Sequence, residues 1–360
     1  MIFNGIIKIN IKKINILSIN YKKFLILLII LGEKPFRAKQ IMNYIYNFYI
    51  NDLNLINNIN KKILNKIKKI LNIKNIKIYK IIYSNDGTIK FIMKIDKQRI
   101  ETIYIPEKYR ATLCISSQIG CFVGCKFCLT GKQGFNRNLY ISEIISQILN
   151  VKKIIKKKKL KNITNIVFMG MGEPLLNFKN VVSSILIIVD KYCLNFSKYR
   201  ITLSTVGIIP ALKKLKNIID INLALSLHFT NNKIRNNLIP INNKYNIKNI
   251  LKASKEYINN SKVNKNGLTI EYVMLKNVND NTKDVYKLIS ILKNIPCKIN
   301  LIPFNNFLKS KFICSTKKKI NTFFKILKKN GFIVTIRKKR GNDINASCGQ
   351  LSGKILNRIN

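Results

Sequence analysis

From Ala111 onward, short apolar runs alternate with longer stretches of helical periodicity, and this alternation constrains the fold more than any other feature. The apolar runs lie near 111–117, 163–169, 199–204, 221–227, 268–275, 297–303 and 332–336. Helical stretches lie between them, for example 141–155, 178–192, 247–259, 281–293 and 317–329. Repeated strand–helix units predict a parallel sheet covered by helices. Six units and a last strand are fewer than the eight units of a closed barrel, so we predict an α/β partial barrel with its active site at the C-terminal ends of the strands.

The residues before this region follow a different pattern. Residues 14–31 have helical spacing that Gly32 would end, and 38–50 and 60–71 also read as helices, so residues 1–75 are predicted to form a small helical N-terminal domain. Two β-rich runs flank Asn85-Asp86-Gly87, which is a hairpin signal. We therefore expect a β-hairpin linker region over 76–110, with the barrel and a cysteine-bearing C-terminal loop over 111–360.

The charge of the chain allows two interpretations. Lys and Arg number 66 and Asp and Glu number 15, so the net charge is +51. Such a charge suggests a polyanionic partner, most simply nucleic acid. However, the abundance of Lys, Ile and Asn is also what an AT-rich gene would encode. Charge alone therefore does not decide between an RNA-binding surface and a merely solvated one.

Several observations indicate the cellular compartment. The longest apolar run, 24–31, is about half of the ~20 residues that a membrane-spanning helix needs. The N-terminus lacks the charged, apolar and small-residue pattern of a secretory signal. We expect a cytoplasmic protein without a membrane partner, in which the eight cysteines stay reduced.

Three cysteines directly follow the first strand of the barrel, as Cys121-x-x-x-Cys125-x-x-Cys128. Three thiolates within eight residues can converge on one metal centre. Structural zinc usually takes four protein ligands, and the sequence places no His or second Cys pair nearby. Thiolates are the usual ligands of iron–sulfur clusters. Three of them leave one iron of a four-iron cluster open for chemistry, so we favour a catalytic cluster over a structural metal.

Small polar groups follow several of the other predicted strands. Met169-Gly170-Met171-Gly172-Glu173-Pro174 follows the second strand, where the glycines allow close backbone approach and Glu173 can accept from an ammonium group. Ser204, Ser226-Leu227-His228 and Asn305 end later strands. His228 is the only histidine; it is either a packed residue or part of the pocket, and we assign it no proton-transfer role.

The three-cysteine motif after a first strand resembles the radical S-adenosylmethionine (SAM) superfamily. The resemblance implies a partial (β/α)6 barrel and one [4Fe–4S] cluster held by Cys121, Cys125 and Cys128. In that superfamily the free iron chelates SAM, and electron transfer releases a 5′-deoxyadenosyl radical. The resemblance implies that SAM is bound by Gly172, Glu173, Ser204, Ser226, Leu227, His228 and Asn305.

Longer stretches are similar to one family within this superfamily. They are Gly32-Glu33-Lys34-Pro35-Phe36-Arg37-Ala38, 114–121, 134–139, 169–176 and 337–351, and together they extend the resemblance over 14–353. They look like the RlmN-type dual-specificity RNA methyltransferases. This family methylates C2 of adenosine in 23S rRNA, at the peptidyl-transferase centre, and in tRNA, at the adenosine 3′ of the anticodon.

The resemblance also implies how the reaction proceeds. One SAM methylates Cys348, and the radical from a second SAM takes a hydrogen from that S-methyl group, so that the methylene radical adds to C2. Glu101 matches the proposed proton acceptor. Cys114 matches the resolving thiol, which forms a transient disulfide bond with Cys348 and releases the RNA. An intracellular electron donor and a disulfide reductant are then required, and we expect a monomer.

Two sets of basic residues are candidate RNA contacts. Arg137 and 337–340 flank the presumed active site, and Lys34, Arg37 and Lys39 make the helical domain a candidate RNA platform. Cys193, Cys297 and Cys314 match no catalytic position, and we expect them to be packed or incidental.

Three alternatives stay open. A C8-methylating relative (Cfr-type) uses the same cysteines, a radical-SAM activase would not need Cys348, and an RNA-binding protein with structural zinc would not cleave SAM. Departures from the family pattern at Val206, Phe229-Thr230 and Asn306 concern details of the pocket.

Overall fold

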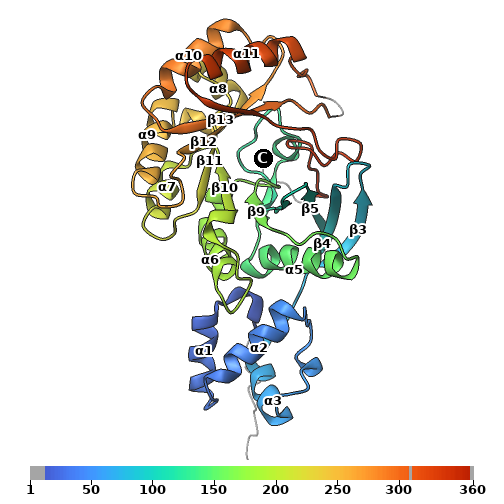
Figure 1. The fold of residues 1–360 in the computed structure, drawn as a ribbon. Coiled ribbons are helices and arrows are strands. Elements are labelled where there is room, and N and C mark those ends of the chain that lie inside the picture. The colour runs from blue at the N-terminus through green and yellow to red at the C-terminus, as the bar shows by residue number, and fades with distance from the viewer. Residues whose placement is uncertain (1–12, 308–309, 357–360) are drawn as a thin grey trace, which may run out of the picture.

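The structure, a computed structural model, describes residues 13–307 and 310–356 and consists of two lobes (Figure 1). The smaller lobe is the N-terminal domain, and its core is made by three helices. Its elements are β1 (Ile14–Asn15), η1 (Ile16–Ser18), α1 (Tyr21–Ile30), α2 (Phe36–Asn47), η2 (Leu53–Leu55), α3 (Lys61–Ile70) and β2 (Leu71–Asn72). The predicted helical domain therefore exists, although its residues 1–12 lie outside the described part of the chain.

The first predicted helix is shorter than its periodicity suggested. Helix α1 begins at Tyr21, where the side chain of Asn20 accepts a hydrogen bond from the Lys23 N–H (3.0 Å). It ends before Gly32, whose φ of +75° suits the left-handed position after a helix. The residues from Ile14 to Ser18 instead form a short strand, paired in parallel with β2, and one 3-10 turn.

The larger lobe is built on one ten-stranded sheet, ordered β14-β13-β12-β11-β10-β9-β6-β5-β4-β3. Its strands are β3 (Lys77–Tyr83), β4 (Ile89–Ile95), β5 (Gln98–Pro106), β6 (Ala111–Cys114), β9 (Asn165–Phe168), β10 (Ile201–Thr205), β11 (Asn222–Ser226), β12 (Leu268–Met274), β13 (Cys297–Pro303) and β14 (Ile333–Ile336). Neighbouring strands from β6 to β14 are parallel. The predicted order of strands and crossovers in a partial barrel is confirmed.

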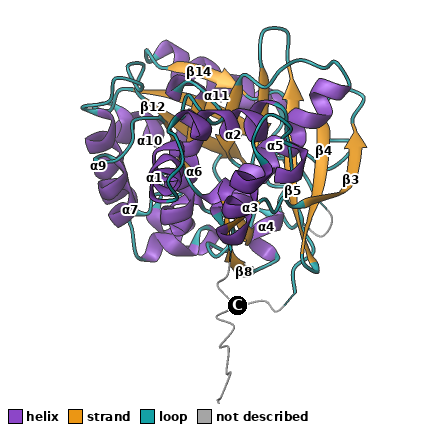
Figure 2. Ribbon diagram, turned by 90° about the horizontal axis from the view of Figure 1, so that it is seen from below, coloured by secondary structure: helices purple, strands orange, loops and turns teal. Residues whose placement is uncertain are grey.

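Helices connect the parallel strands and lie on the outer side of the sheet (Figures 1 and 2). They are α5 (Ile141–Lys157), α6 (Phe178–Val189), α7 (Ile209–Leu215), α8 (Asn232–Leu238), α9 (Ile247–Ile258), α10 (Thr282–Leu292) and α11 (Lys317–Lys329), with short turns η3 (Pro174–Asn177), η4 (Lys198–Arg200) and η5 (Pro240–Asn243). The first crossover also contains the hairpin β7 (Gln118–Gly120) and β8 (Phe135–Asn138), with α4 (Leu129–Lys132) between its strands. The cysteine motif lies in this hairpin loop.

Residues 76–110 differ from the expected hairpin linker. They form three strands rather than two, and these strands continue the main sheet beyond β6. The pairing is antiparallel: Ile103 on β5 lies opposite Cys114 on β6 and, on its other side, opposite Lys90 on β4. Because side chains alternate along a strand, Lys90, Glu101, Ile103 and Cys114 share one face of the sheet. The other face packs on α5, where Thr102 donates to Gln147 (2.8 Å).

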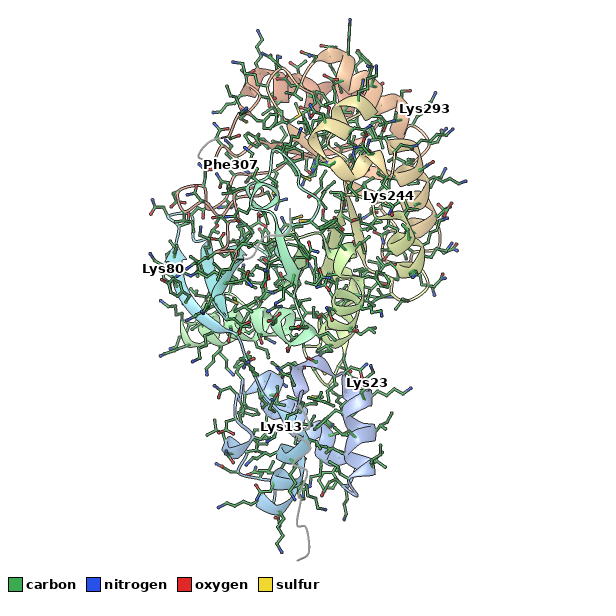
Figure 3. All side chains as sticks on the ribbon, turned by 180° about the vertical axis from the view of Figure 1, so that it is seen from behind. Lys13, Lys23, Lys80, Lys244, Lys293 and Phe307 are labelled. Atoms are coloured by element: carbon green, nitrogen blue, oxygen red, sulfur yellow. The ribbon has the colours of Figure 1, made fainter. Side chains whose placement is uncertain are left out.

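The N-terminal domain packs against the barrel at the end of α6. The backbone N–H of Tyr21 donates to the Asp190 carboxylate (3.2 Å), and the rings of Tyr21 and Tyr192 lie 4.1 Å apart. Within the described residues, no helix is both long enough and apolar enough to cross a membrane. The lysines labelled in Figure 3 lie on both lobes.

Candidate active site

A cavity of about 170 Å³ opens at the C-terminal ends of the parallel strands. It is lined by all three motif cysteines and by Cys348, together with nearly all of the predicted SAM ligands. These lining residues include Cys121, Cys125, Cys128, Gly172, Glu173, Ser204, Ser226, His228, Asn305 and Cys348. Leu227 is the exception, because it is fully buried and does not line the cavity. Residues far apart in the sequence are thus brought to the place where a partial barrel carries its site.

The cysteine loop is held in the β7–β8 hairpin by backbone hydrogen bonds. The Cys121 N–H donates to Gly134 O (2.9 Å), and the Cys128 N–H donates to Cys125 O (3.1 Å). Burial raises the pKa of the Cys121 thiol to about 12 and that of Cys125 well above its usual value, and neighbouring cysteines raise both further. A cationic centre is therefore needed before these sulfurs can bind as thiolates.

The spacing of the thiols fits an iron–sulfur cluster better than a single ion. Within the described ranges, no three metal-ligating side chains stand close enough to hold one metal ion. A zinc ion draws its ligands tightly around one centre, whereas a [4Fe–4S] cube takes each thiolate on a different iron. The donor set, three closely spaced cysteines of one loop that line the same cavity, fits a cube with one open iron.

Arg235 lies beneath the cysteine loop and is completely buried. Its guanidinium donates to the carbonyls of Leu227 (3.0 Å), Val206 (2.8 Å) and Ser226 (3.2 Å), and to the side chain of Asn242. It thereby ties together the ends of β10 and β11. Burial lowers the pKa of Arg235 to about 10, while the nearby Cys125 sulfur favours its charged form. Arg235 supplies positive charge next to the sulfurs that would carry a cluster.

Glu173 is held rigidly at the cavity wall. One carboxylate oxygen accepts from the Leu175 N–H (3.0 Å) and the Thr205 hydroxyl (2.7 Å), and the other accepts from the Val206 N–H (2.9 Å). Since a carboxylate has about four acceptor positions, one remains for an ammonium group. Burial raises the pKa of Glu173 to about 7, against the lowering effect of these bonds.

Gly172 sets the path of this loop. Its φ is +97°, and a Cβ there would lie 2.5 Å from the side chain of Gln118. Only glycine satisfies both conditions. Gln118 in turn accepts from the Glu173 N–H (2.9 Å), so the glycine allows the close approach that positions the carboxylate.

A second carboxylate, Glu271 on β12, lies in the same cavity. It accepts from the hydroxyls of Ser204 (2.8 Å) and Ser226 (3.3 Å), and its other oxygen lies 3.6 Å from the Arg337 guanidinium. The two serines predicted to bind SAM are therefore joined by an acceptor that can reorient their hydroxyls. Arg337 links this group to the C-terminal segment.

His228 and Asn305 complete the wall. Burial and the charge of Arg235 lower the pKa of His228 to about 3, and its Nδ1 accepts from the Val273 N–H (3.2 Å). A neutral, bonded imidazole agrees with the assignment of no proton transfer. Asn305 donates to the carbonyl of Cys348 (3.1 Å), while its buried Oδ1 has no hydrogen-bond partner among the described residues. Such an acceptor fits a polar ligand such as SAM.

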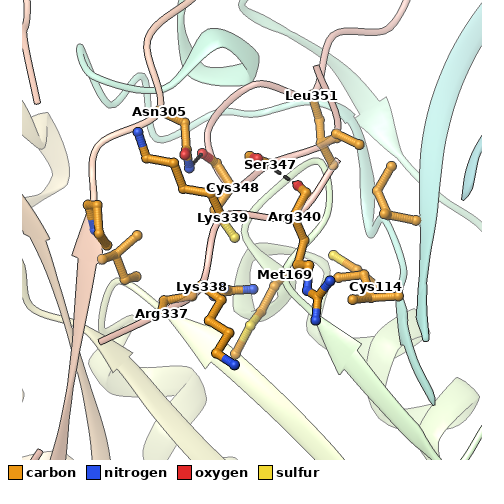
Figure 4. A pocket seen from close by; sticks show the side chains of 15 residues that line it. Cys114, Met169, Asn305, Arg337, Lys338, Lys339, Arg340, Ser347, Cys348 and Leu351 are labelled. Atoms are coloured by element: carbon orange, nitrogen blue, oxygen red, sulfur yellow. Dashed lines mark hydrogen bonds between the residues drawn. The ribbon is translucent and has the colours of Figure 1, made fainter. Parts of the chain in front are cut away.

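Cys348 and Cys114 face a smaller, adjoining cavity of about 30 Å³, shown in Figure 4. Cys114 lies on β6 and is buried, and Cys348 lies on the C-terminal loop. Burial raises the pKa of both thiols, that of Cys114 to about 12, and Arg337 acts in the opposite direction on each. Both cysteines are reduced in this structure. The structure thus brings together the pair for which the resemblance implies a disulfide.

Glu101 lies on the same sheet face as Cys114 but lines neither cavity. Its side chain is 3% exposed, and its carboxylate accepts from the Ser352 N–H (3.1 Å) and lies 3.4 Å from the Lys90 ammonium. Burial raises the pKa of Glu101, and Lys90 lowers it. The expected base is therefore close to the cysteine loop without direct access to the large cavity.

The basic residues divide into two groups. Arg137 makes a two-pronged ion pair with Glu143 (2.8 Å for each bond) and is therefore already engaged. The basic run from Arg337 to Arg340 lines the smaller cavity. Within the run, Arg337 pairs with Glu271 and Arg340 with Asp86, whereas Lys338 and Lys339 are exposed, so these two lysines are the better candidates for contact with a polyanion near the active site.

Sequence reasoning missed Arg235, Glu271 and Lys90. A usable signal existed for the last two, because each is a charged residue within a largely apolar strand, although Lys94 shares β4 with Lys90. Glu271 interrupts Leu268–Met274, and Lys90 interrupts Ile89–Ile95. Since charged residues are rarely buried without a partner, such interruptions mark candidate functional positions. Arg235 carried no comparable signal, because its helix α8 is largely polar.

Comparisons with known proteins agree with this geometry. Residues 115–289 match the profile of the Radical SAM superfamily, and residues 14–73 match that of the ribosomal RNA large subunit methyltransferase N-terminal domain. A solved radical SAM methyltransferase from Sphaerobacter thermophilus has a TM-score of 0.87 and 32% identity, covering 94% of this chain and 99% of that one.

Full-length relatives narrow the assignment. The dual-specificity RNA methyltransferase RlmN of Buchnera aphidicola (subspecies Schizaphis graminum) is 56% identical over 96% of this chain and 96% of its own. The RlmN of Wigglesworthia glossinidia brevipalpis is 56% identical over 97% of this chain and 92% of its own. At this identity over nearly the full length, the chain belongs to the RlmN dual-specificity RNA methyltransferases of the radical SAM superfamily, which use a [4Fe–4S] cluster and SAM.

Proposed function

We propose that this protein methylates C2 of adenosine in 23S rRNA and in tRNA, through a methylated cysteine and a transient disulfide. The observation that carries the proposal is the position of Cys348. It lines the large cavity together with the three motif cysteines, and it also lines the small cavity together with Cys114. One sulfur can thus face the cofactors in one step and the resolving thiol in the next.

The need for such a sulfur follows from the substrate. C2 of adenine is an electron-poor carbon, so it cannot take a methyl group from SAM by simple displacement. The cluster and SAM supply the carbon-centred radical that activates the methyl group. Cys348 carries that methyl group. Two hydrogen bonds hold the Cys348 loop at the cavity: Asn305 donates to Cys348 O, and the Leu129 N–H donates to Gly349 O (2.8 Å).

Other residues of this chain have complementary roles in the proposal. Glu173 and the serines at 204 and 226 bind SAM, supported by their place in the cavity wall. Glu101 takes the C2 proton. The unpaired electron that radical addition leaves on the ring passes to a one-electron acceptor, such as the oxidised form of the electron donor. The Cys114 thiolate then attacks the Cys348 sulfur; the S–S bond forms, the C–S bond to the RNA breaks with its electron pair on the methylene carbon, and that carbon takes a proton. An intracellular reductant must reopen the disulfide before each turnover.

RNA access rests on two general requirements. The target adenine must leave its stack to reach the site. The phosphates must be held by cations, for which Lys338 and Lys339 are the best-placed residues. A monomeric, cytoplasmic enzyme with an intracellular electron donor remains the prediction from the sequence.

The direct test is anaerobic incubation of the reconstituted protein with deproteinised RNA, SAM and a reductant, followed by mass spectrometry of the nucleosides. We expect 2-methyladenosine; 8-methyladenosine would favour the C8 relative instead. Cys348→Ala should abolish the product, and Cys297→Ala, at the start of β13, is the matched control. Undiminished product from the Cys348 variant would refute the S-methylcysteine route.

A further inference from the structure

Lys90 is a buried lysine near the start of β4, and the reaction described above assigns it no task. Its side chain is 7% exposed, and its ammonium lies 3.4 Å from the Glu101 carboxylate. Both residues project from the sheet face that carries Cys114. Elsewhere on the same strand Lys94 is exposed, so burial of Lys90 is specific to its position.

The Lys90–Glu101 pair holds the Cys348 loop on both sides of the cysteine. Lys90 donates to the carbonyl of Asn345 (3.3 Å), three residues before Cys348. Glu101 accepts from the backbone N–H of Ser352 (3.1 Å), four residues after it. The two ends of the loop are thus fastened to neighbouring strands by two charges that also bind each other.

The rest of the loop is held from the opposite side. Leu129 donates to Gly349 O (2.8 Å), the Thr130 hydroxyl donates to Leu351 O (2.7 Å), and Asn305 donates to Cys348 O (3.1 Å). These contacts come from the cluster side of the barrel. Between residues 345 and 353, the ion pair supplies the polar contacts with the sheet that carries Cys114. Outside this range the segment is also bound to the sheet, by Asp343 to Ser84 (2.6 Å) and by Lys354 O to the Arg99 N–H (3.0 Å).

Stability alone does not explain such a pair. A buried ion pair loses much of its attraction to desolvation, and apolar residues of similar volume often serve a fold as well. The surroundings of Glu101 are sparsely charged. Lys90 from β4 lowers its pKa, burial raises it, and the C-terminal segment offers only the Ser352 amide. From the β6 side, the Ser116 hydroxyl binds the backbone carbonyl of Glu101 and not its carboxylate.

We propose that Lys90 is a positioning residue that keeps Glu101 ionised and fastens the Cys348 loop until Glu101 accepts a proton. The inference rests on the proposed function, in which Glu101 takes the C2 proton. The C2–H bond breaks and the proton binds a Glu101 oxygen. The electron pair of that bond restores the aromatic adenine ring, while the unpaired electron left by radical addition passes to a one-electron acceptor, the oxidised form of the electron donor. Neutral Glu101 no longer attracts Lys90, and its hydrogen bond from Ser352 weakens. The loop is then free to carry the Cys348 sulfur to Cys114.

Amide hydrogen exchange of the anaerobically reconstituted protein, without RNA, tests the fastening. Lys90→Met removes the cation at nearly constant volume, and Glu101→Gln imitates the protonated base. Both should speed exchange in residues 345–353 by about tenfold, the loss expected for one charge-assisted hydrogen bond. Lys94→Met is the matched control and should leave that exchange unchanged. Retained protection in β4 and β5 shows that each variant is folded.

Two results would overturn the proposal. If residues 345–353 of folded Lys90→Met exchange at the wild-type rate, Lys90 does not fasten the loop. If they do so in Glu101→Gln, protonation of Glu101 does not release it. The pH profile of methylation gives a further readout: without Lys90, only the Ser352 N–H opposes the effect of burial on the pKa of Glu101, so the acidic limb should move to higher pH. Faster exchange in a protein that methylates no RNA would refute the proposed function and leave the fastening intact.

Discussion

Replacing Glu173 by Gln should separate the charge of the SAM site from its shape. Both carboxylate oxygens accept a backbone N–H, one from Leu175 and the other from Val206. An amide has only one oxygen, so in either orientation its NH₂ group faces one of these donors. The variant therefore loses the negative charge and also leaves one buried N–H without an acceptor.

The size of the effect follows from these contacts. A hydrogen bond to a charged group contributes about 1.5–3 kcal/mol. If the SAM ammonium uses the remaining acceptor position of Glu173, affinity should fall roughly 10- to 150-fold at pH 8, at 1.4 kcal/mol per factor of ten. We expect the variant to remain folded, because Gln has nearly the same volume as Glu.

The pH dependence of SAM affinity tests the same role of Glu173 independently. With the pKa of Glu173 at about 7, the free site is mostly protonated below that pH. SAM binds the ionised form, so protons compete with it, and wild-type affinity should fall by up to tenfold per pH unit below pH 7. The Gln variant has no such group and should show a flat profile.

The assay is anaerobic equilibrium dialysis of labelled SAM with the reconstituted protein from pH 5.5 to 8.5, a range of about 1.5 units on either side of the pKa. Glu256→Gln, on α9 and outside the cavity, is the control for loss of a carboxylate. A change of less than about threefold at pH 8, well below the loss of one charge-assisted bond, would refute the role of Glu173. A wild-type pH slope in the Gln variant would do the same.

Three further predictions concern the reaction, the scaffold and the substrate. Cys114→Ala should accumulate a covalent protein–RNA adduct on denaturing gels, because no thiol is left to attack the Cys348 sulfur; free methylated RNA at the wild-type rate would contradict this. Arg235→Met should lower the free energy of unfolding in urea by about 3–5 kcal/mol, since three buried carbonyls and the Asn242 side chain lose their donor; a loss below 1 kcal/mol would show that these groups find other partners. RNA affinity should fall steeply and linearly on a log–log plot against salt, and a flat plot would argue against phosphate contacts.

The contacts of buried charged residues on the strands, such as Glu271, could not be predicted from the sequence. The periodicity of β12 predicted a strand, but it could not indicate that Glu271 meets hydroxyls from β10 and β11, because parallel neighbours are separated by whole helices. The third strand over 98–106 was also missed. Its residues are mostly buried on both faces, so the alternation that marks a half-exposed strand is weak.

The order of strands could be read from the chain itself, as could the three cysteines and the polar strand-end residues that line the cavity, because they depend on local spacing and residue chemistry. The tertiary structure alone decided which distant groups meet. It placed Cys348 between two cavities and set Lys90 beside Glu101 across two antiparallel strands. Such contacts depend on the register of the sheet and on the path of the C-terminal loop, and neither leaves a periodic trace in the sequence.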